Sequence, residues 1–416
     1  MSTCSVCNKD FEDEYFDVEQ NKCILHCEKH EKNYWFAINK NNKIEWHTDK
    51  VILFWKKINN EIEAITDAKI NNIEISEEMI KEYNYEHFKY KFKKVIFPMS
   101  IPDSPDYISF HKLNCDIDIN FIECEFLSFV DFSLLNKAKN INFSECKFFS
   151  SIIFENMKFD NQFFLESCVV HDNMNFVNIV FTNITSFMNS EFYKELNFMH
   201  SRFDDLAIFN GLKGGTLFLG NTFFRKEANF LSMNIGVHDR ETARIIKNSF
   251  EQQNNIIEAN KFYALEMKER EKELNKDIKE GKNIFEWLIF KAHAISSNHS
   301  QDWLLALLWI LNIAFIFSMF TSTFHHNNML AYISIFIVVI SSTFNNTLLK
   351  IALGINLIIA SILSYIYLDV IADKINPFSI MTSKDPITFG LLMFKITIAY
   401  LIYQFIVSVR QNTRRK

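Results

Sequence analysis

The amino-acid sequence predicts a β-solenoid between a cysteine- and histidine-rich N-terminal region and a C-terminal region of long apolar segments. A bulky apolar residue recurs from Phe110 to Phe209 at alternating intervals of five and six, and only Lys137 misses its slot. An amphipathic helix would place apolar residues three and four apart, and a half-buried strand two apart. A fixed eleven-residue period that fits neither therefore predicts short coils stacked as a solenoid.

The sixth position of each repeat indicates how many repeats form one coil. Cysteine occupies this position in every second repeat, at Cys124, Cys146 and Cys168. Two repeats therefore make one coil of four faces, with phenylalanines of successive coils stacked about 4.8 Å apart. We expect the cysteines to form a column of small buried residues, and a metal or redox site is the alternative interpretation. The stacked rings fill the interior, where we expect no ligand cavity.

The pattern F-x-x-a-x-F-x-x-x-x-x-F resembles the phenylalanine-rich variant of the pentapeptide-repeat proteins over about residues 110–236. The resemblance implies a right-handed quadrilateral β-solenoid, which we place at residues 110–237. After Phe209 the register slips across three glycines, at positions 211, 214 and 215, and resumes one residue early. A bulge or loop on one face would explain the slip.

Residues 1–30 contain the spacing C-x2-C, fifteen intervening residues, and C-x2-H-C-x2-H. Two short-spaced pairs of sulfur and nitrogen ligands are typical of tetrahedral zinc sites. We predict a structural Zn²⁺ ion bound by Cys4, Cys7, Cys23 and His26, with Cys27 or His30 as alternative fourth ligands. Six candidate ligands are present for the four coordination positions of a zinc ion, which favours a closed site. Such a site would either stabilise a small cap or form a docking region for a partner. Free thiols or a disulfide are the alternatives to a metal.

The segments on either side of the repeats have different compositions. Residues 31–109 mix apolar runs with charged stretches, and we expect an α+β cap that ends at three prolines between positions 98 and 105. Residues 238–282 are rich in helix formers and carry a sparse apolar stripe, with Gly281 at the expected end. They predict a helical connector.

Residues 283–416 predict a membrane domain, because long apolar segments follow one another there. Spanning a bilayer requires about twenty apolar residues. We expect four spans, at 303–320, 329–344, 347–368 and 387–409, although 329–368 would alternatively form a re-entrant pair. An amphipathic helix before the first span is expected at the membrane interface, with Trp287 and Trp303 at headgroup depth.

The basic residues near the spans predict the orientation. The C-terminal tail holds the strongest cluster, Arg410, Arg414, Arg415 and Lys416, so the tail is expected in the cytoplasm. An even number of spans then places the N-terminus in the cytoplasm too. Few glycines and prolines beside abundant Asn, Lys, Ile and Phe are typical of an AT-rich bacterial genome. We therefore expect a multi-pass protein of the bacterial inner membrane.

Polar residues inside the apolar segments are candidate functional residues, chiefly Lys395, Gln404 and Asn356. A lysine buried in a membrane costs a few kcal/mol and usually faces a partner or water. Lys395 would line a pore or polar groove, or alternatively bond between helices or extend to the nearer membrane surface.

We expect no enzymatic activity, because the sequence contains no Ser-His-Asp, P-loop or dinucleotide-binding pattern. The leading hypothesis is a solenoid that binds an unknown cytosolic protein and gates a channel-like or membrane-permeabilising domain of a homo-oligomer, in stress or phage defence. A tethered scaffold without transport is the first alternative. A DNA mimic that protects a topoisomerase, as the resemblance suggests, is the second. Residues 110–239 hold 10 Lys and Arg against 16 Asp and Glu, so we expect no nucleic-acid binding.

Overall fold

The structure is a computed structural model that forms two compact units, Met1–Asn254 and Asn255–Lys416. The boundary falls inside the predicted connector, whose first helix belongs to the first unit and whose second helix belongs to the second. The structure describes residues 1–29, 37–40, 43–46, 48–70, 85–86, 89–98, 118–133, 140–321, 354–355, 358–359 and 389–413.

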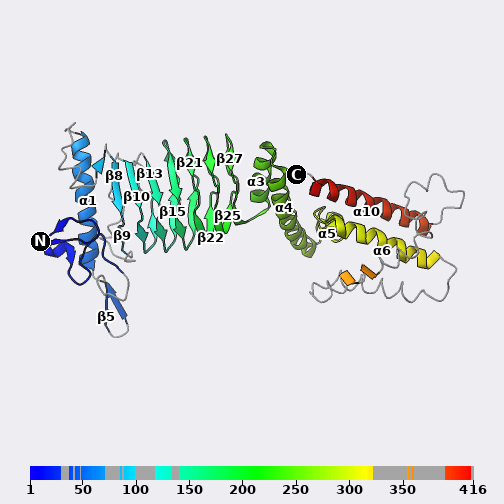
Figure 1. The fold of residues 1–416 in the computed structure, drawn as a ribbon, viewed down its shortest axis with the longest axis horizontal. Coiled ribbons are helices and arrows are strands. Elements are labelled where there is room, and N and C mark those ends of the chain that lie inside the picture. Colours follow the sequence, from blue (N-terminus) through cyan, green and yellow to red (C-terminus); the bar gives the residue numbers. More distant parts are fainter. Residues whose placement is uncertain are drawn as a thin grey trace. The chain divides into compact units, whose positions relative to one another are not determined.

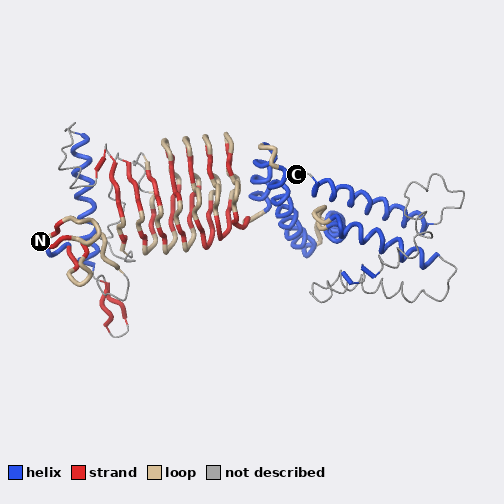
Figure 2. The backbone as a smooth tube through the Cα atoms, viewed as in Figure 1, coloured by secondary structure: helices blue, strands red, loops and turns tan. Residues whose placement is uncertain are grey.

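Most of the first unit is a solenoid of short parallel strands that stack into four ladders (Figures 1 and 2). The first ladder contains β8 (Lys89–Lys93), β10 (Asp118–Ile122), β13 (Ile141–Ser144), β17 (Phe163–Glu166), β21 (Thr185–Ser186), β24 (Ala207–Ile208) and β27 (Ala228–Asn229). The second contains β9 (Ile96–Phe97), β11 (Glu125–Phe126), β14 (Lys147–Phe148), β18 (Val169–Val170) and the start of β22 (Glu191–Asn197). The third contains β12 (Val130–Asp131), β15 (Ile152–Glu155), β19 (Met174–Val177) and the end of β22, followed by β25 (Lys213–Phe218) and β28 (Asn234–Val237). The fourth contains β16 (Lys158–Phe159), β20 (Val180–Phe181), β23 (Arg202–Phe203) and β26 (Phe223–Phe224).

The strand register confirms that two eleven-residue repeats make one coil. Phe121 pairs with Phe143, and Phe154 pairs with Phe176, each two repeats further along the chain. The paired rings lie nearly parallel, with centroids 4.9 and 4.7 Å apart. The described slot residues between positions 121 and 209 are all buried, so the apolar period marks the inward positions of the coils.

The solenoid begins earlier in the chain than residue 110, where the sequence placed its start. The rings of Phe92 and Phe97 stack on Phe121 and Phe126 at 5.0 and 4.5 Å, in the same ladders as the later coils. These two phenylalanines have the five-residue interval of the repeat, but the chain between them and Phe121 is longer than one coil requires. The predicted slots at Phe110 and Cys115, and the irregular Lys137, lie outside the described residues.

The corner before each sixth position has a left-handed backbone. Residues with positive φ recur every eleven positions, as at Asn156, Ser167, Asn178 and Asn189. Asparagine tolerates this conformation better than most residues because its short side chain bonds locally. The sixth-position residue then turns inward, and Ser190 Oγ donates to the carbonyl of Leu165 at 3.0 Å.

The cysteines at the sixth position make the same kind of hydrogen bond to a backbone carbonyl at their corners. The Cys146 thiol donates to the carbonyl oxygen of Phe121 at 3.4 Å, and Cys124 donates to that of Phe92 at 3.3 Å. These contacts favour the expected structural role for the column.

The slip of register is a bulge in the third ladder, as the sequence predicted. The pairing of β22 with β25 shifts between Phe192 and Glu195, opposite Gly214 and Gly215. Gly214 has a φ of +84°, and a Cβ at Gly215 would lie 1.8 Å from the carbonyl oxygen of Lys194. Only glycine fits where the two backbones approach this closely.

Helices cover both ends of the solenoid. At the first coil, Phe54 and Trp55 of α1 (Thr48–Ile70) contact Phe97, with ring centroids 5.8 and 6.0 Å away. At the last coil, α3 (Arg240–Gln252) buries Ile246 and Phe250, and Ser249 Oγ donates to the carbonyl of Ala228 at 2.7 Å. Two short hairpins complete the unit outside the cysteine-rich region: β5 (Ala37–Lys40) pairs with β6 (Lys43–Trp46), and β7 (Tyr85–Glu86) pairs with β8.

The second unit is helical. It contains α4 (Ile256–Asp277), a short 3₁₀ turn (Ile278–Glu280), α5 (Ile284–Ser297), α6 (Trp303–Thr321) and α10 (Phe389–Thr413). Gly281 ends the turn with a φ of 73°, as expected for the end of the connector. The helices α6 and α10 run antiparallel, because Trp303 contacts Phe405 and Phe317 stacks on Phe394 at 3.9 Å (Figure 1).

Two of the four predicted spans correspond to described helices, 303–320 to α6 and 387–409 to α10. Within the described part of the chain, α10 is the one helix long and apolar enough to cross a membrane, and the searched part of α6, Trp303–Ala314, is shorter. The predicted span 329–344 and Asn356 lie outside the described residues, and of the predicted span 347–368 the structure describes residues 354–355 and 358–359 alone.

We expect Phe176→Ala to destabilise the solenoid by about 3–5 kcal/mol, because it opens a cavity between stacked rings. The matched control is Phe149→Ala, since Phe149 is 42% exposed and its loss should cost about 1 kcal/mol. Thermal unfolding of the full chain in detergent micelles, followed by circular dichroism, measures both. Equal shifts in unfolding temperature for the two variants would contradict the inward stacking.

Candidate metal centre

The cysteine-rich region is built from two small antiparallel hairpins. In the first, β1 (Ser2–Thr3) pairs with β2 (Asp10–Phe11), and in the second, β3 (Phe16–Asp17) pairs with β4 (Lys22–Cys23). The turn of the first hairpin contains Asn8 with a φ of 55°, whose amide donates to the carbonyl of Cys4 at 2.9 Å. This tight turn presents two cysteines on one side, as metal-binding knuckles do.

Four side chains converge between the hairpins. The ligand atoms of Cys4, Cys7, Cys23 and His26 all lie within 4.8 Å of one another. Nδ1 of His26 lies 3.0 Å from the sulfur of Cys23 and 3.7 Å from that of Cys4. Ligand atoms of a tetrahedral zinc site are about 3.4–3.8 Å apart, so this cluster has suitable dimensions for a metal ion. The predicted ligand set is therefore brought together by the fold.

Groups around the four ligands orient them. The backbone N–H of Cys23 donates to the sulfur of Cys4 at 3.2 Å, an interaction that favours a thiolate. Nε2 of His26 lies 2.9 Å from the carbonyl oxygen of Lys93, which must accept its proton. That bond fixes the tautomer in which Nδ1 is unprotonated and faces the sulfurs. The donor set and its surroundings therefore fit a closed, structural metal site.

The structure also decides between the alternative fourth ligands that it describes. Cys27 is buried, but its thiol lies 3.6 Å from the carbonyl oxygen of Ile24 and is not part of the cluster. Burial raises its pKa, which keeps it protonated. His30 lies outside the described residues. His26 is the ligand that the geometry supports.

Two of the thiols share a proton. A hydrogen bond with Cys23 lowers the pKa of Cys7 to about 4, and the same bond raises the pKa of Cys23, which holds the proton. Crowding of sulfurs thus leaves one thiolate beside one thiol. A bound cation would displace the remaining proton, as expected for a site whose ligands bind metal as thiolates.

Lys29 is a buried charged residue that the sequence pattern did not reveal. It is 2% exposed and donates to the carbonyls of Leu25 and Cys27 at 3.3 and 3.1 Å. Its Nζ lies 4.9 Å from the ring centroid of Phe54 in α1. Burial lowers its pKa to about 8. Lys29 therefore joins the turn that carries His26 to the helix that covers the first coil.

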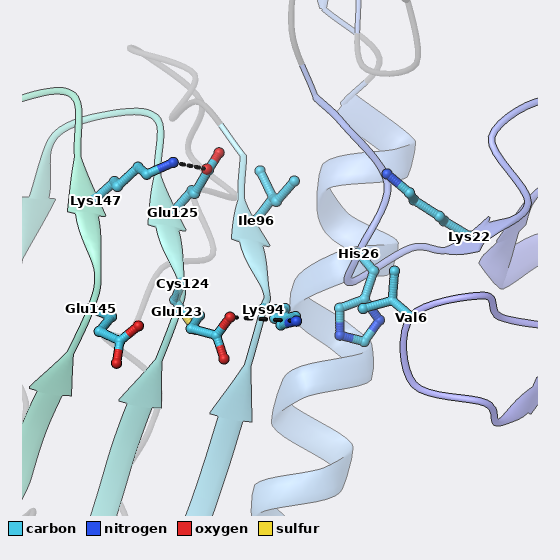
Figure 3. Close-up of a pocket in the computed structure, with 10 residues that line it drawn as sticks. All are labelled: Val6, Lys22, His26, Lys94, Ile96, Glu123, Cys124, Glu125, Glu145 and Lys147. Atoms are coloured by element: carbon cyan, nitrogen blue, oxygen red, sulfur yellow. Dashed lines mark hydrogen bonds and ion pairs between the residues drawn. The ribbon is translucent and has the colours of Figure 1, made fainter.

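A cavity of about 410 Å³ lies between the cysteine-rich region and the first coils of the solenoid (Figure 3). His26 lines it together with charged residues from three neighbouring corners, Lys94, Glu123 and Glu145. Lys94 and Glu123 form an ion pair of 3.4 Å, and Lys147 pairs with Glu125 at 3.2 Å. The mixed charges make this a solvated junction beside the metal centre.

The polar residues predicted inside the membrane region face the interior of the helical unit. Lys395 and Gln404 of α10 are 4% and 3% exposed. Oε1 of Gln404 accepts hydrogen bonds from Ser297 Oγ at 3.1 Å and Ser300 Oγ at 3.2 Å. Asn312 of α6, another polar residue that the sequence places inside an apolar segment, is fully buried, and its side-chain amide has no hydrogen-bond partner among the described residues.

Ser300 connects Gln404 to two histidines. Nε2 of His293 lies 3.0 Å from Ser300 Oγ, and Nδ1 of His293 lies 3.3 Å from Nδ1 of His299. Burial lowers the pKa of both histidines, so both are neutral at pH 7. No characteristic spacing along the chain indicates this cluster, because it joins His293 of α5, His299 and Ser300 of the following turn, and Gln404 of α10.

Comparisons of the chain with protein-family models, with curated proteins and with solved structures found no match. A function must therefore be argued from the geometry of the described residues.

We expect that removing the metal or replacing a ligand loosens the N-terminal region. Cys23→Ser should abolish binding of one equivalent of zinc and increase proteolysis within the first thirty residues, whereas Cys27→Ser should leave the zinc content unchanged. Zinc content measured by elemental analysis of the purified full chain, with and without a chelator, checks both. Loss of zinc in Cys27→Ser but not in Cys23→Ser would contradict the assigned set.

Proposed function

We propose that the chain is a membrane-anchored protein of the bacterial inner membrane whose zinc-stapled solenoid binds a cytosolic protein. The observation that carries the anchoring is the distribution of residues around α10. Many of its exposed residues are large and apolar, with Phe389 at 77% and Ile406 at 58%, whereas Lys395, Gln404 and Ser408 are buried. A helix of a water-soluble protein has the opposite arrangement. A lipid environment stabilises a helix whose apolar side chains face outward and whose polar side chains contact neighbouring helices.

The helix α5 supports the same proposal. Phe285, Leu288 and Ile289 are exposed by 83%, 50% and 68%, and they follow the charged end of α4. Exposed apolar residues in a helix beside charged residues are typical of a helix that lies in the membrane interface. The indole of Trp287 donates to Asn275 at 2.9 Å, a polar anchor suited to headgroup depth.

The outside of the solenoid carries a row of regularly spaced aromatic side chains that would form a docking surface. Phe149, His171 and Tyr193 stack outside the coils, with ring centroids 5.1 and 4.8 Å apart, and Tyr193 is 57% exposed. Beside them, Lys194 pairs with Asp172 at 2.7 Å and Lys147 with Glu125. An aromatic row flanked by paired charges is typical of protein-binding surfaces, while phosphate binding would need unpaired basic residues. This combination favours a protein partner over nucleic acid, and a scaffold or channel regulator over a DNA mimic.

A conducting membrane domain is the second candidate function, and buried polar groups favour it. Asn312 of α6 and Lys395 of α10 are both buried in helices that are otherwise apolar. Polar and ionisable residues inside membrane helices are found along ion and proton pathways. We propose that copies of the chain assemble around this pair of helices to form the pathway.

We expect Ile396→Asp to release the full chain from membranes, because Ile396 lies on the exposed face of α10 and a carboxylate there costs about 2.5–3.5 kcal/mol. Leu231→Asp is the matched control, since Leu231 is an exposed residue of the first unit. The assay is alkaline extraction of membranes from expressing cells, with a chain ending at Lys282 as the soluble reference. If Ile396→Asp stays in the membrane while the control behaves the same way, the lipid-facing assignment is wrong.

We expect the full chain to depolarise expressing cells and Lys395→Leu to change the rate, while Ile396→Leu on the exposed face leaves it unaltered. A voltage-sensitive dye reports the membrane potential. If no potential change occurs although extraction shows the chain in the membrane, the tethered scaffold becomes the better account and transport is rejected.

A further inference from the structure

His293 and His299 face each other where three helices of the second unit meet. His293 belongs to α5, and His299 lies in the turn between α5 and α6. Asn298, His299 and Ser300 all have positive φ, between 47° and 63°. Successive left-handed residues without glycine cost about 1–2 kcal/mol each. This turn is held by the Ser300 amide, which donates to Ser297 Oγ at 3.0 Å, and it directs His299 back onto His293.

The hydrogen bonds determine which ring nitrogens carry protons. Ser300 Oγ donates to Gln404, so it must accept from Nε2 of His293. The Nδ1 of a neutral His293 is then unprotonated. Nδ1 of His299, 3.3 Å away, must therefore carry its ring's proton, since two lone pairs would repel each other.

That assignment leaves one buried nitrogen unsatisfied. Nε2 of His299 is then unprotonated, and it has no hydrogen-bond partner among the described residues. The nearest carboxylate oxygen, Oε2 of Glu271 in α4, lies 3.9 Å away and also presents lone pairs. His299 is 6% exposed, so water does not readily replace the missing donor. One additional positive charge in the cluster would satisfy this nitrogen.

We propose that a divalent transition-metal ion such as Zn²⁺ binds between Nδ1 of His293 and Nδ1 of His299. Two nitrogens each about 2.0–2.1 Å from a tetrahedral ion lie about 3.3–3.4 Å apart, which matches the observed 3.3 Å. With both Nδ1 atoms on the ion, both Nε2 atoms carry protons. Nε2 of His293 donates to Ser300, and Nε2 of His299 presents a proton to the Glu271 carboxylate 3.9 Å away, where it otherwise presents a lone pair to another lone pair.

The groups nearest to the two Nε2 atoms are those expected around metal-bound histidines. Such rings usually donate their second N–H to a carboxylate or another fixed acceptor. Glu271 is itself fixed by Lys291, whose Nζ lies 3.0 Å away, and Ser300 is fixed by Gln404. His293 is half-buried, which leaves water free to fill the remaining coordination positions. The ion links Glu271 of α4, the turn before α6, and Gln404 of α10.

The test is equilibrium dialysis of the full chain in detergent micelles against ZnCl₂ at neutral pH. The wild type should bind two ions, and His299→Gln should bind one, which is the ion of the cysteine site. Glu271→Gln should keep the second ion with an affinity lower by about 10–100-fold. His238→Gln is the matched control, because Nε2 of His238 also lies 3.9 Å from a carboxylate, that of Glu195, without a second histidine.

A second measurement does not depend on the folding of a variant. Zinc added to the wild type should shift the NMR signals of Nδ1 in both His293 and His299, with labelled ring nitrogens. Cobalt should give bands without sulfur-to-metal charge transfer at this site, unlike at Cys4, Cys7, Cys23 and His26. Equal zinc content in the wild type and in His299→Gln overturns the proposal, whether that content is one ion or two. Ring signals that respond only to acid would assign the additional positive charge to a proton and equally overturn it.

Discussion

The first unit depends on the stacking of aromatic rings that no single coil can bury by itself. Phe92, Phe121 and Phe143 form one continuous column, with ring centroids 5.0 and 4.9 Å apart. The faces of each ring are covered by the rings before and after it, while rings of the other ladders meet it edge-on, so the two ends of the column need other covers. The helix α1 supplies one and α3 the other. The cysteine-rich region extends the first cover, because the carbonyl of Leu25 accepts from the amide of Ile96 at 2.9 Å and His26 bonds to Lys93.

Because the first coil needs a cover, the metal centre would have a structural role there. His26 donates to the carbonyl of Lys93, the last residue of β8, and through Nδ1 it faces Cys4 and Cys23. An ion at the four ligands therefore fixes a side chain that is bonded to the first coil. Lys29 also attaches the cysteine-rich region to α1, since its ammonium group contacts two backbone carbonyls and the ring of Phe54. Four converging side chains supply a complete tetrahedral set of ligands, as in structural zinc sites.

The solenoid and the metal ligands were predictable from the sequence because both depend on spacing along the chain. The interval from Phe121 to Phe126 sets the coil, and C-x2-C with C-x2-H sets the knuckles. The start at Lys89 was missed, because extra residues separate Phe97 from Phe121 and interrupt the period. Lys29 and the His293–His299 pair were missed for another reason. A buried lysine between carbonyls, or two histidines joined through a left-handed turn, have no characteristic spacing, and only tertiary contacts reveal them.

The two metal sites differ in how firmly they would hold an ion. Three sulfurs and one nitrogen surround the N-terminal site, and the backbone N–H of Cys23 and the carbonyl of Lys93 complete its surroundings. Such a site binds its ion as part of folding. The proposed site at His293 and His299 has two protein ligands, so water completes it and the ion exchanges more easily. Because its supporting groups come from α4, the α5–α6 turn and α10, occupancy there changes contacts among helices. The first site is therefore suited to hold a permanent ion in the cap, and the second is suited to respond to the availability of metal.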